Sequence, residues 1–167
     1  MIGPARLFAF AVLLPLLAAC EIIITGVYPP GFSLSNAYYL TSYRADADGD
    51  GDLEFVICDD RTSELTYHFD YSGELLRWTS YLQGVTSGQI RGEATFTPDS
   101  AGVYYGGDSV DVTYEIRAGA APLAAPQGIT VVPVPDVIGY TRLYLRVNGY
   151  SGLYSLSSRA IPVLRFC

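Results

Sequence analysis

Acidic side chains recur at every second position between residues 46 and 54. Asp46, Asp48, Asp50, Asp52 and Glu54 follow this spacing, and the stretch contains no basic residue. Carboxylates this close together repel one another unless a cation lies between them. In proteins, calcium takes about six to eight oxygen ligands, mainly carboxylates and backbone carbonyls. We therefore predict a calcium site in which Asp52 contributes its backbone carbonyl and the other four residues contribute side-chain oxygens.

The pattern D-x-D-x-D-G, followed by Leu53 and Glu54, resembles the first half of an EF-hand calcium loop. It is closer to the Asp-rich loops of FG-GAP and dockerin-type repeats, in which the ninth loop position is acidic and a strand follows. The twelfth position, where an EF-hand places a bidentate glutamate, is Ile57, so Asp59 or Asp60 would have to replace that ligand. The resemblance implies a local calcium loop only, because a propeller of FG-GAP repeats needs several copies and this chain has one. The alternative is a solvated hairpin loop, since Asp-Gly is a common turn dipeptide.

The residue types offer little for catalysis or for other metals. His68 is the only histidine, and the alternation around it predicts an exposed side chain beside Thr66 and Asp70 on the polar face of a strand. One histidine and one cysteine pair are too few ligands for a zinc or copper site. The sequence has no G-x-S-x-G nucleophile motif. We predict a non-enzyme with no cofactor apart from calcium; a hydrolase that uses two carboxylates stays open, since such residues can come from anywhere in a fold.

A second candidate surface lies near the C-terminus. Inward and outward residues alternate there with the period of a half-buried strand. The inward set is Thr141, Leu143, Leu145 and Val147, and the outward set is Tyr140, Arg142, Tyr144 and Arg146. Tyrosine and arginine are enriched where proteins bind partners, so we predict that the outward row binds a partner. The alternative is a cross-strand ladder of ordinary strand-forming side chains.

These candidate sites need a scaffold of strands, because period-two alternation extends over nearly all of the chain after residue 20. The clearest predicted hairpin turns at Ser72 and Gly73. Its apolar face consists of Leu65, Tyr67, Phe69, Tyr71, Leu76, Trp78 and Leu82. Residues 118–136 are rich in proline and predict a crossover with a short edge strand at residues 129–132. About nine strands in total predict one all-β domain, an antiparallel sandwich of immunoglobulin-like or jelly-roll-like type, with a closed barrel as the alternative.

The start of the chain predicts secretion. Residues 7–19 form an uninterrupted apolar run after Arg6, as in a signal peptide, and the run is too short for a membrane span of roughly 20 residues. It ends in LAAC at residues 17–20, which resembles the lipobox of bacterial lipoproteins. The resemblance implies that residues 1–19 are removed, that Cys20 becomes the acylated N-terminus, and that residues 20–167 form the mature domain. Several acyl chains hold a protein stably, because each buried methylene contributes about 0.8 kcal/mol.

The same resemblance implies a membrane-anchored protein outside the cytoplasm. Glu21 replaces the aspartate associated with retention in the inner membrane, so we expect the outer membrane if the source has two membranes. Disulfides persist in such oxidising compartments. Cys58 and Cys167 are the two cysteines left after lipidation of Cys20, and we predict that they are bonded to each other. The alternative is a pair of buried free thiols.

Charge excludes one class of partner. The chain has 17 acidic and 10 basic residues and a formal net charge of −7 at pH 7, so nucleic acid is an unsuitable ligand. Taken with the features above, the sequence predicts a non-enzymatic, lipid-anchored subunit of the cell envelope that binds an envelope protein or a glycan. The alternative is a calcium-assisted carbohydrate-binding module.

Overall fold

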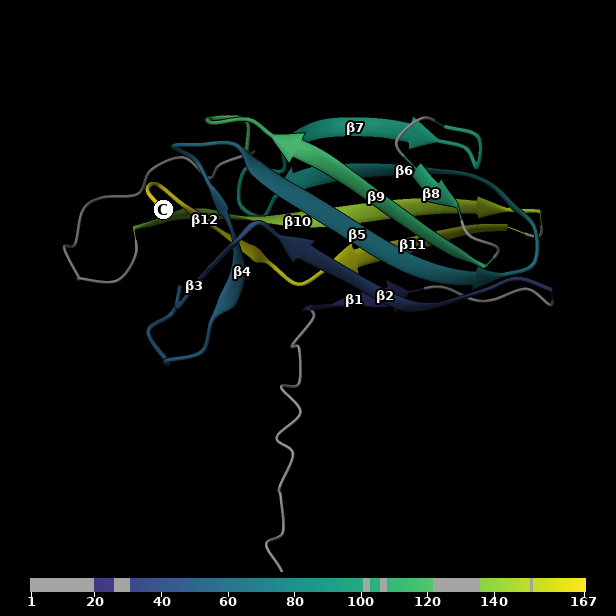
Figure 1. Ribbon diagram of the computed structural model, residues 1–167, viewed down its shortest axis with the longest axis horizontal. Helices are drawn as coiled ribbons and strands as arrows, with labels where there is room; N and C mark the ends of the chain where they lie inside the picture. The colour runs from purple at the N-terminus through teal and green to yellow at the C-terminus, as the bar shows by residue number, and fades with distance from the viewer. Residues whose placement is uncertain (1–19, 26–30, 101–102, 106–107, 122–135, 151) are drawn as a thin grey trace, which may run out of the picture.

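The computed structural model describes residues 20–25, 31–100, 103–105, 108–121, 136–150 and 152–167 (Figure 1). These residues contain twelve strands and no helix. The strands form two layers that pack face to face around a shared apolar core. The predicted all-β sandwich is therefore confirmed, with more strands than the nine predicted. The predicted signal peptide and the predicted edge strand at residues 129–132 lie outside the described residues.

The first layer, which we call sheet A, is antiparallel throughout. Its strands, in spatial order, are β1 (Cys20–Thr25), β2 (Ser33–Thr41), β5 (Ser63–Ser72), β9 (Ser109–Ile116) and β8 (Val103–Tyr105). The second layer, sheet B, starts from the same β1. Its further strands, in spatial order, are β11 (Gly152–Ser158), β10 (Val137–Gly149), β6 (Leu75–Gly84) and β7 (Ile90–Phe96).

Strand β1 joins the two sheets along one edge of the sandwich. Its first two residues, Cys20 and Glu21, pair with β2, and residues 22–25 pair with β11. At the opposite edge the sheets separate, since β7 belongs to sheet B and β8 and β9 to sheet A. Sheet A thus curves like half of a barrel, and the described strands do not close into the barrel that was the alternative prediction.

Three short strands extend the structure beyond sheet B. Strand β12 (Ile161–Leu164) pairs with β10 and, in parallel, with β4 (Glu54–Cys58), which also pairs with β3 (Tyr43–Ala45). Both faces of β4 are buried: Phe55 and Ile57 contact the main core, while Val56 packs in a second cluster with Leu164. This burial holds the strand that follows the Asp-rich loop.

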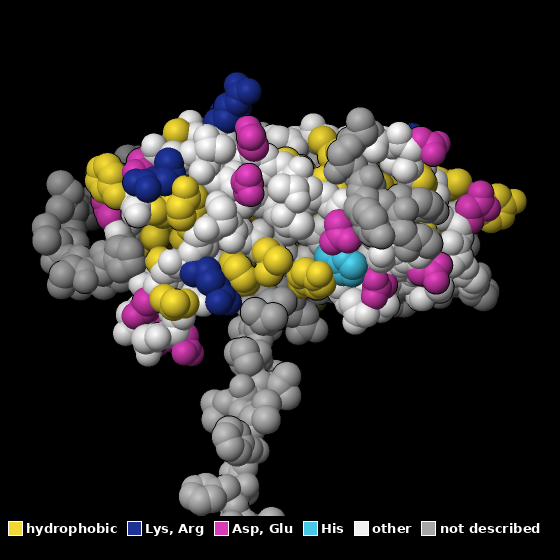
Figure 2. Space-filling view, in the orientation of Figure 1, with side chains coloured by type: hydrophobic (Ala, Val, Ile, Leu, Met, Phe, Trp, Pro, Cys, Tyr) yellow, Lys and Arg dark blue, Asp and Glu magenta, His cyan; other side chains and the backbone are white. Residues whose placement is uncertain are grey.

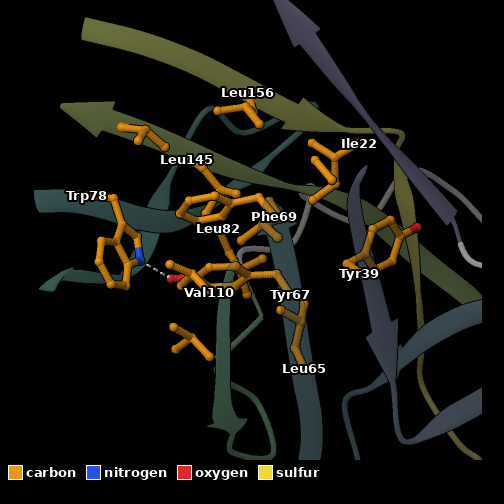
Figure 3. Packing of buried hydrophobic residues seen from close by; sticks show 14 of the residues in the cluster. Ile22, Tyr39, Leu65, Tyr67, Phe69, Trp78, Leu82, Val110, Leu145 and Leu156 are labelled. Atoms are coloured by element: carbon orange, nitrogen blue, oxygen red, sulfur yellow. Dashed lines mark hydrogen bonds between the residues drawn. The ribbon is translucent and has the colours of Figure 1, made fainter. Parts of the chain in front are cut away.

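The core confirms the alternation predicted for the longest strands. Leu65, Tyr67 and Phe69 of β5 are each 0% exposed. Across the core, the Trp78 indole N–H of β6 donates a 2.7 Å hydrogen bond to the Tyr67 hydroxyl (Figure 3). The Tyr67 hydroxyl in turn donates to Ser80 Oγ at 3.3 Å. Buried polar groups need such partners, so these bonds fix how the two sheets face each other.

The predicted hairpin between β5 and β6 is wrong. The two strands follow each other in sequence, but β5 pairs with β2 and β9, and β6 pairs with β10 and β7. The turn instead carries the chain from sheet A to sheet B. Gly73 at this turn has φ +93°, and a Cβ there would lie 2.1 Å from the Gly31 carbonyl oxygen, so the crossing needs a glycine.

The apolar face of β6 also starts one residue earlier than predicted. Leu75 is 5% exposed, whereas Leu76 is 42% exposed. The register between β6 and β10 shifts between Asn148 and Gly149, and such a bulge moves the residues beyond it to the other face of a strand. Trp78 and Leu82, at 0% and 4% exposure, follow the prediction.

Cys58 and Cys167 form a disulfide, as predicted, with their Cα atoms 5.8 Å apart. The bond ties the C-terminal residue to the end of β4. Next to it, the Asp59 amide donates to the Leu164 carbonyl at 2.8 Å, which continues the pairing of β4 with β12. Within the described residues, no helix has the length and apolar character to cross a membrane.

Candidate functional site

The Asp-rich loop connects β3 to β4 and is folded around its own carboxylates. Asp46 accepts hydrogen bonds from the Gly49 amide at 2.7 Å and from the Gly51 amide at 3.1 Å. Asp48 accepts from the Asp50 amide at 3.2 Å. These Asx-type bonds are a local property of aspartate in turns, and they hold the carboxylates on the inside of the loop.

Three of the five predicted ligands come together in this loop. Asp46, Asp48 and Asp50 each offer a carboxylate oxygen, and these oxygens lie within 4.8 Å of one another. Asp52 and Glu54 are not part of that group. The structure thus brings together an acidic cluster of hard oxygen ligands, the donor type that calcium and magnesium prefer.

The negative charges of this cluster nevertheless affect the ionisation of Glu54. Its pKa is raised, first by partial burial and then by the carboxylates of Asp48, Asp50 and Asp46; a hydrogen bond with the Ala47 backbone opposes the shift. A raised pKa means that the ionised form of Glu54 is disfavoured in the folded protein. A cation bound among these carboxylates would neutralise their charge and so remove the repulsion that contributes to the raised pKa of Glu54.

The second candidate site lies on the outer face of sheet B. We define the Tyr/Arg face as the outward residues Tyr140, Arg142, Tyr144 and Arg146 of β10 together with Arg77 and Tyr81 of β6. The four inward residues of β10 are each 0% exposed, so the predicted division of this strand is confirmed. Tyr140 is 42% exposed, and Arg77, Arg142 and Arg146 are exposed.

Aromatic stacking links the two strands of the Tyr/Arg face. Tyr144 is directly opposite Tyr81 in the ladder, and their rings stack with centroids 5.3 Å apart and planes 10° apart. The Arg146 guanidinium carbon lies 5.1 Å from the centre of the Tyr81 ring, within the range of a cation–π contact. The contact restricts the Arg146 side chain before any partner arrives.

The arginines of this face have no carboxylate partner within the described part of the chain. The ion pairs found there involve Arg61, Arg165 and His68. Strands β6, β10 and β11 contain no acidic residue at all. Three exposed guanidinium groups therefore lie beside stacked tyrosines on strands without an acidic residue; the nearest strand with one is β7, which contains Glu93.

The outer face of sheet A carries a network that the sequence did not predict. His68 Nδ1 lies 2.9 Å from Asp111 Oδ1, and its Nε2 lies 3.0 Å from Asp70 Oδ1. Asn36 donates to the other oxygen of Asp70, and the Tyr38 ring stacks on the imidazole with centroids 4.7 Å apart. The predicted exposed histidine is therefore wrong: only 14% of its side chain is exposed.

This network determines what His68 can do. Both ring nitrogens already face carboxylate oxygens, so neither is available to take a proton from a substrate. Burial, and then the negative charges of Asp111 and Asp70, raise the pKa of Tyr38. Only the pairing of β5 with β9 places Asp111 opposite His68, so no local sequence pattern could have revealed the network. Figure 2 shows the histidine (cyan) among acidic side chains (magenta) on this face.

No protein-family model matches the chain, and a search of curated proteins finds no match.

Proposed function

We propose that this protein is a lipid-anchored, non-enzymatic subunit of the bacterial cell envelope that acts by binding, with the Tyr/Arg face as its binding surface. One observation carries the proposal: three exposed arginines that form no ion pair within the described residues lie beside a stacked tyrosine pair on the outer face of sheet B. Arginine and tyrosine dominate binding hot spots. Because stacking holds Tyr81, Tyr144 and Arg146 in place, these three side chains lose little entropy when a partner binds.

The anchor in this proposal is Cys20. Cys20 lies within β1 and is paired with Tyr39 of β2, so an acyl group on it would leave no flexible linker before the domain. Such a short connection suits a subunit held against the outer membrane. Mass spectrometry of the protein from its host is expected to show a chain that begins at Cys20 and carries acyl groups. An unlipidated, soluble chain that begins elsewhere would contradict the anchor.

Calcium is the second component of the proposal. Asp46, Asp48 and Asp50 fit the ion, since each keeps oxygen lone pairs beyond the loop hydrogen bonds. Glu54 and the Asp52 carbonyl would complete the ligand set. This cluster also favours a second candidate function, a calcium-assisted glycan-binding module, which predicts retention on a polysaccharide column only when calcium is present.

Extraction of the native membrane in mild detergent, followed by pull-down, tests the binding surface. The wild-type protein is expected to retain a partner in constant ratio, and Tyr144→Ala with Arg146→Ala is expected to weaken capture at least about 30-fold, the loss of roughly 2 kcal/mol typical of a hot spot. Tyr150→Ala with Arg117→Ala is the matched control, because both residues are exposed and lie outside the Tyr/Arg face. Equal capture by all three proteins would show that the face binds nothing.

A further inference from the structure

The two outer faces of the sandwich carry opposite charges. On sheet A, β5 and β9 contain no arginine or lysine and four acidic residues, all directed outward: Glu64, Asp70, Asp111 and Glu115; His68 lies between the two aspartates. On sheet B, β6, β10 and β11 contain no acidic residue and three outward arginines, namely Arg77, Arg142 and Arg146; the outermost strand, β7, adds one acidic and one basic residue, Glu93 and Arg91. Figure 2 shows the acidic face, with magenta side chains along β5 and β9.

The acidic face, like the Tyr/Arg face, has no internal counter-charge at its most exposed point. Glu64 is directly opposite Glu115 in the ladder between β5 and β9, and both are exposed. Like charges directly opposite each other destabilise a sheet. No basic side chain forms an ion pair with either glutamate in the described residues, so a cationic group from outside the molecule would relieve the repulsion.

The arginines follow a definite spacing along sheet B. Arg142 and Arg146 are four residues apart on β10, which corresponds to about 13 to 14 Å. Asn148 follows Arg146 by two residues on β10, and Arg77 is opposite Asn148 on the neighbouring strand β6. The positive charges therefore lie at positions zero, four and six of a row about 20 Å long.

The carboxylates of sheet A repeat this spacing in part. Glu115 and Asp111 are four residues apart on β9. Asp70 is opposite Ser109, again two residues further and one strand to the side. The bond to His68 occupies only one oxygen of Asp111, so the other can accept from a guanidinium. The two rows therefore match at their first two positions, Glu115 and Asp111 against Arg142 and Arg146. The third position does not match, because Asp70 lies on the strand nearer to β1 and Arg77 on the strand farther from it.

The position of β1 is compatible with contact between these faces in neighbouring molecules. Figure 1 looks along the direction in which the two sheets are stacked, and β1 lies along one edge of the sandwich. Copies stacked front to back along this direction would all present β1, and therefore Cys20, at the same edge. All of their anchors could then enter one membrane.

We propose that the partner of the Tyr/Arg face is the acidic outer face of sheet A in a second copy of this chain. This inference rests on the proposed function and names its partner. The contact joins two different surfaces, so repeating it gives an open row and no closed dimer. A contact of four strands by eight residues covers only about 500 Å² per copy, less than the roughly 800 Å² of a standard interface. Single contacts are therefore weak, and confinement at a membrane strengthens them by raising the effective concentration.

Sedimentation velocity of the full-length protein in mild detergent tests this inference. At low ionic strength, the wild-type protein is expected to form assemblies larger than a dimer as its concentration rises. Salt at about 0.5 M shortens the screening length to about 4 Å and should return the protein to monomers. Arg142→Glu with Arg146→Glu reverses one face, and Glu64→Arg with Glu115→Arg reverses the other. Each variant alone is expected to stay monomeric, because its two faces now carry the same charge.

An equimolar mixture of the two variants is the decisive control. Each reversed face then meets an opposite charge on the other variant, so the mixture is expected to assemble as the wild type does, which a misfolded variant could not. Wild-type protein that stays monomeric, stops at the dimer, or assembles equally well after either reversal would overturn the inference. If the wild type is monomeric while the pull-down captures a different envelope protein through the Tyr/Arg face, self-association is wrong and the proposed function stands.

Discussion

Removal of the disulfide is expected to lower the melting temperature by roughly 10 to 20 °C. The bond joins residues 109 positions apart, and closing a loop of about 100 residues stabilises the folded state by about 4.7 kcal/mol on the chain-entropy model. In a protein of this size each kcal/mol shifts the melting temperature by about 2 to 4 °C. Cys58→Ala with Cys167→Ser is the variant of choice, because Cys58 is 1% exposed and a buried hydroxyl would add its own penalty.

Thermal unfolding followed by circular dichroism, with and without reductant, measures this effect. Reduced wild-type protein should melt near the double variant. Reductant should leave the variant unchanged, which controls for effects on the rest of the protein. A wild type that melts at the same temperature in both conditions, or whose two thiols alkylate fully while it is folded, would show that the bond does not stabilise the domain.

Calcium is expected to raise the melting temperature by roughly 5 to 10 °C at a free concentration 100 times its Kd. Preferential binding to the folded state at that concentration stabilises it by about 2.7 kcal/mol. Each kcal/mol again raises the melting temperature by about 2 to 4 °C. Asp48→Ala with Asp50→Ala removes two of the three clustered carboxylates and is expected to abolish the rise. Identical melting curves in calcium and in chelator would show that the loop is a solvated turn that binds no calcium.

Glu54→Gln separates metal binding from charge repulsion. The pKa of Glu54 is raised in the folded protein, so its ionised form destabilises the metal-free state, and stability falls as pH rises through its titration. The neutral glutamine is therefore expected to melt slightly higher than wild type in chelator at neutral pH, but to gain less from calcium. Glu93→Gln, an exposed acid on β7 outside the loop, is the matched control and should change neither value. A Glu54→Gln protein with the full calcium response would remove Glu54 from the ligand set.

Alternation predicted the faces of the strands better than their partners. Leu65, Tyr67 and Phe69 are buried as predicted, because a period of two fixes which side chains share a face. The same pattern cannot distinguish a hairpin, in which two apolar faces lie side by side, from an arch, in which they face each other across a core. Residues 63–84 form the arch, and the bond between Trp78 and Tyr67 is its consequence.

Some site residues could likewise be predicted from the local sequence, whereas others depend on which strands pair. Asp46, Asp48 and Asp50 are close in sequence, and a turn suffices to bring them together. The outward row of β10 follows from alternation, but its stacking on Tyr81 depends on which strand lies beside it. The histidine network needs residues from β2, β5 and β9, and the opposite charges of the two faces appear only once each strand is assigned to a sheet.

Photo-crosslinking in the living host tests the central claim, that the Tyr/Arg face is the binding surface, most directly. A photoreactive phenylalanine analogue in place of Tyr140, which is 42% exposed on that face, is expected to give one dominant adduct. The adduct should disappear when Arg142→Glu and Arg146→Glu are added. The same analogue at Tyr150, 80% exposed in the turn after β10, should give little or none. An adduct at position 150 but not at 140, or one at 140 that survives both charge reversals, would contradict the claim.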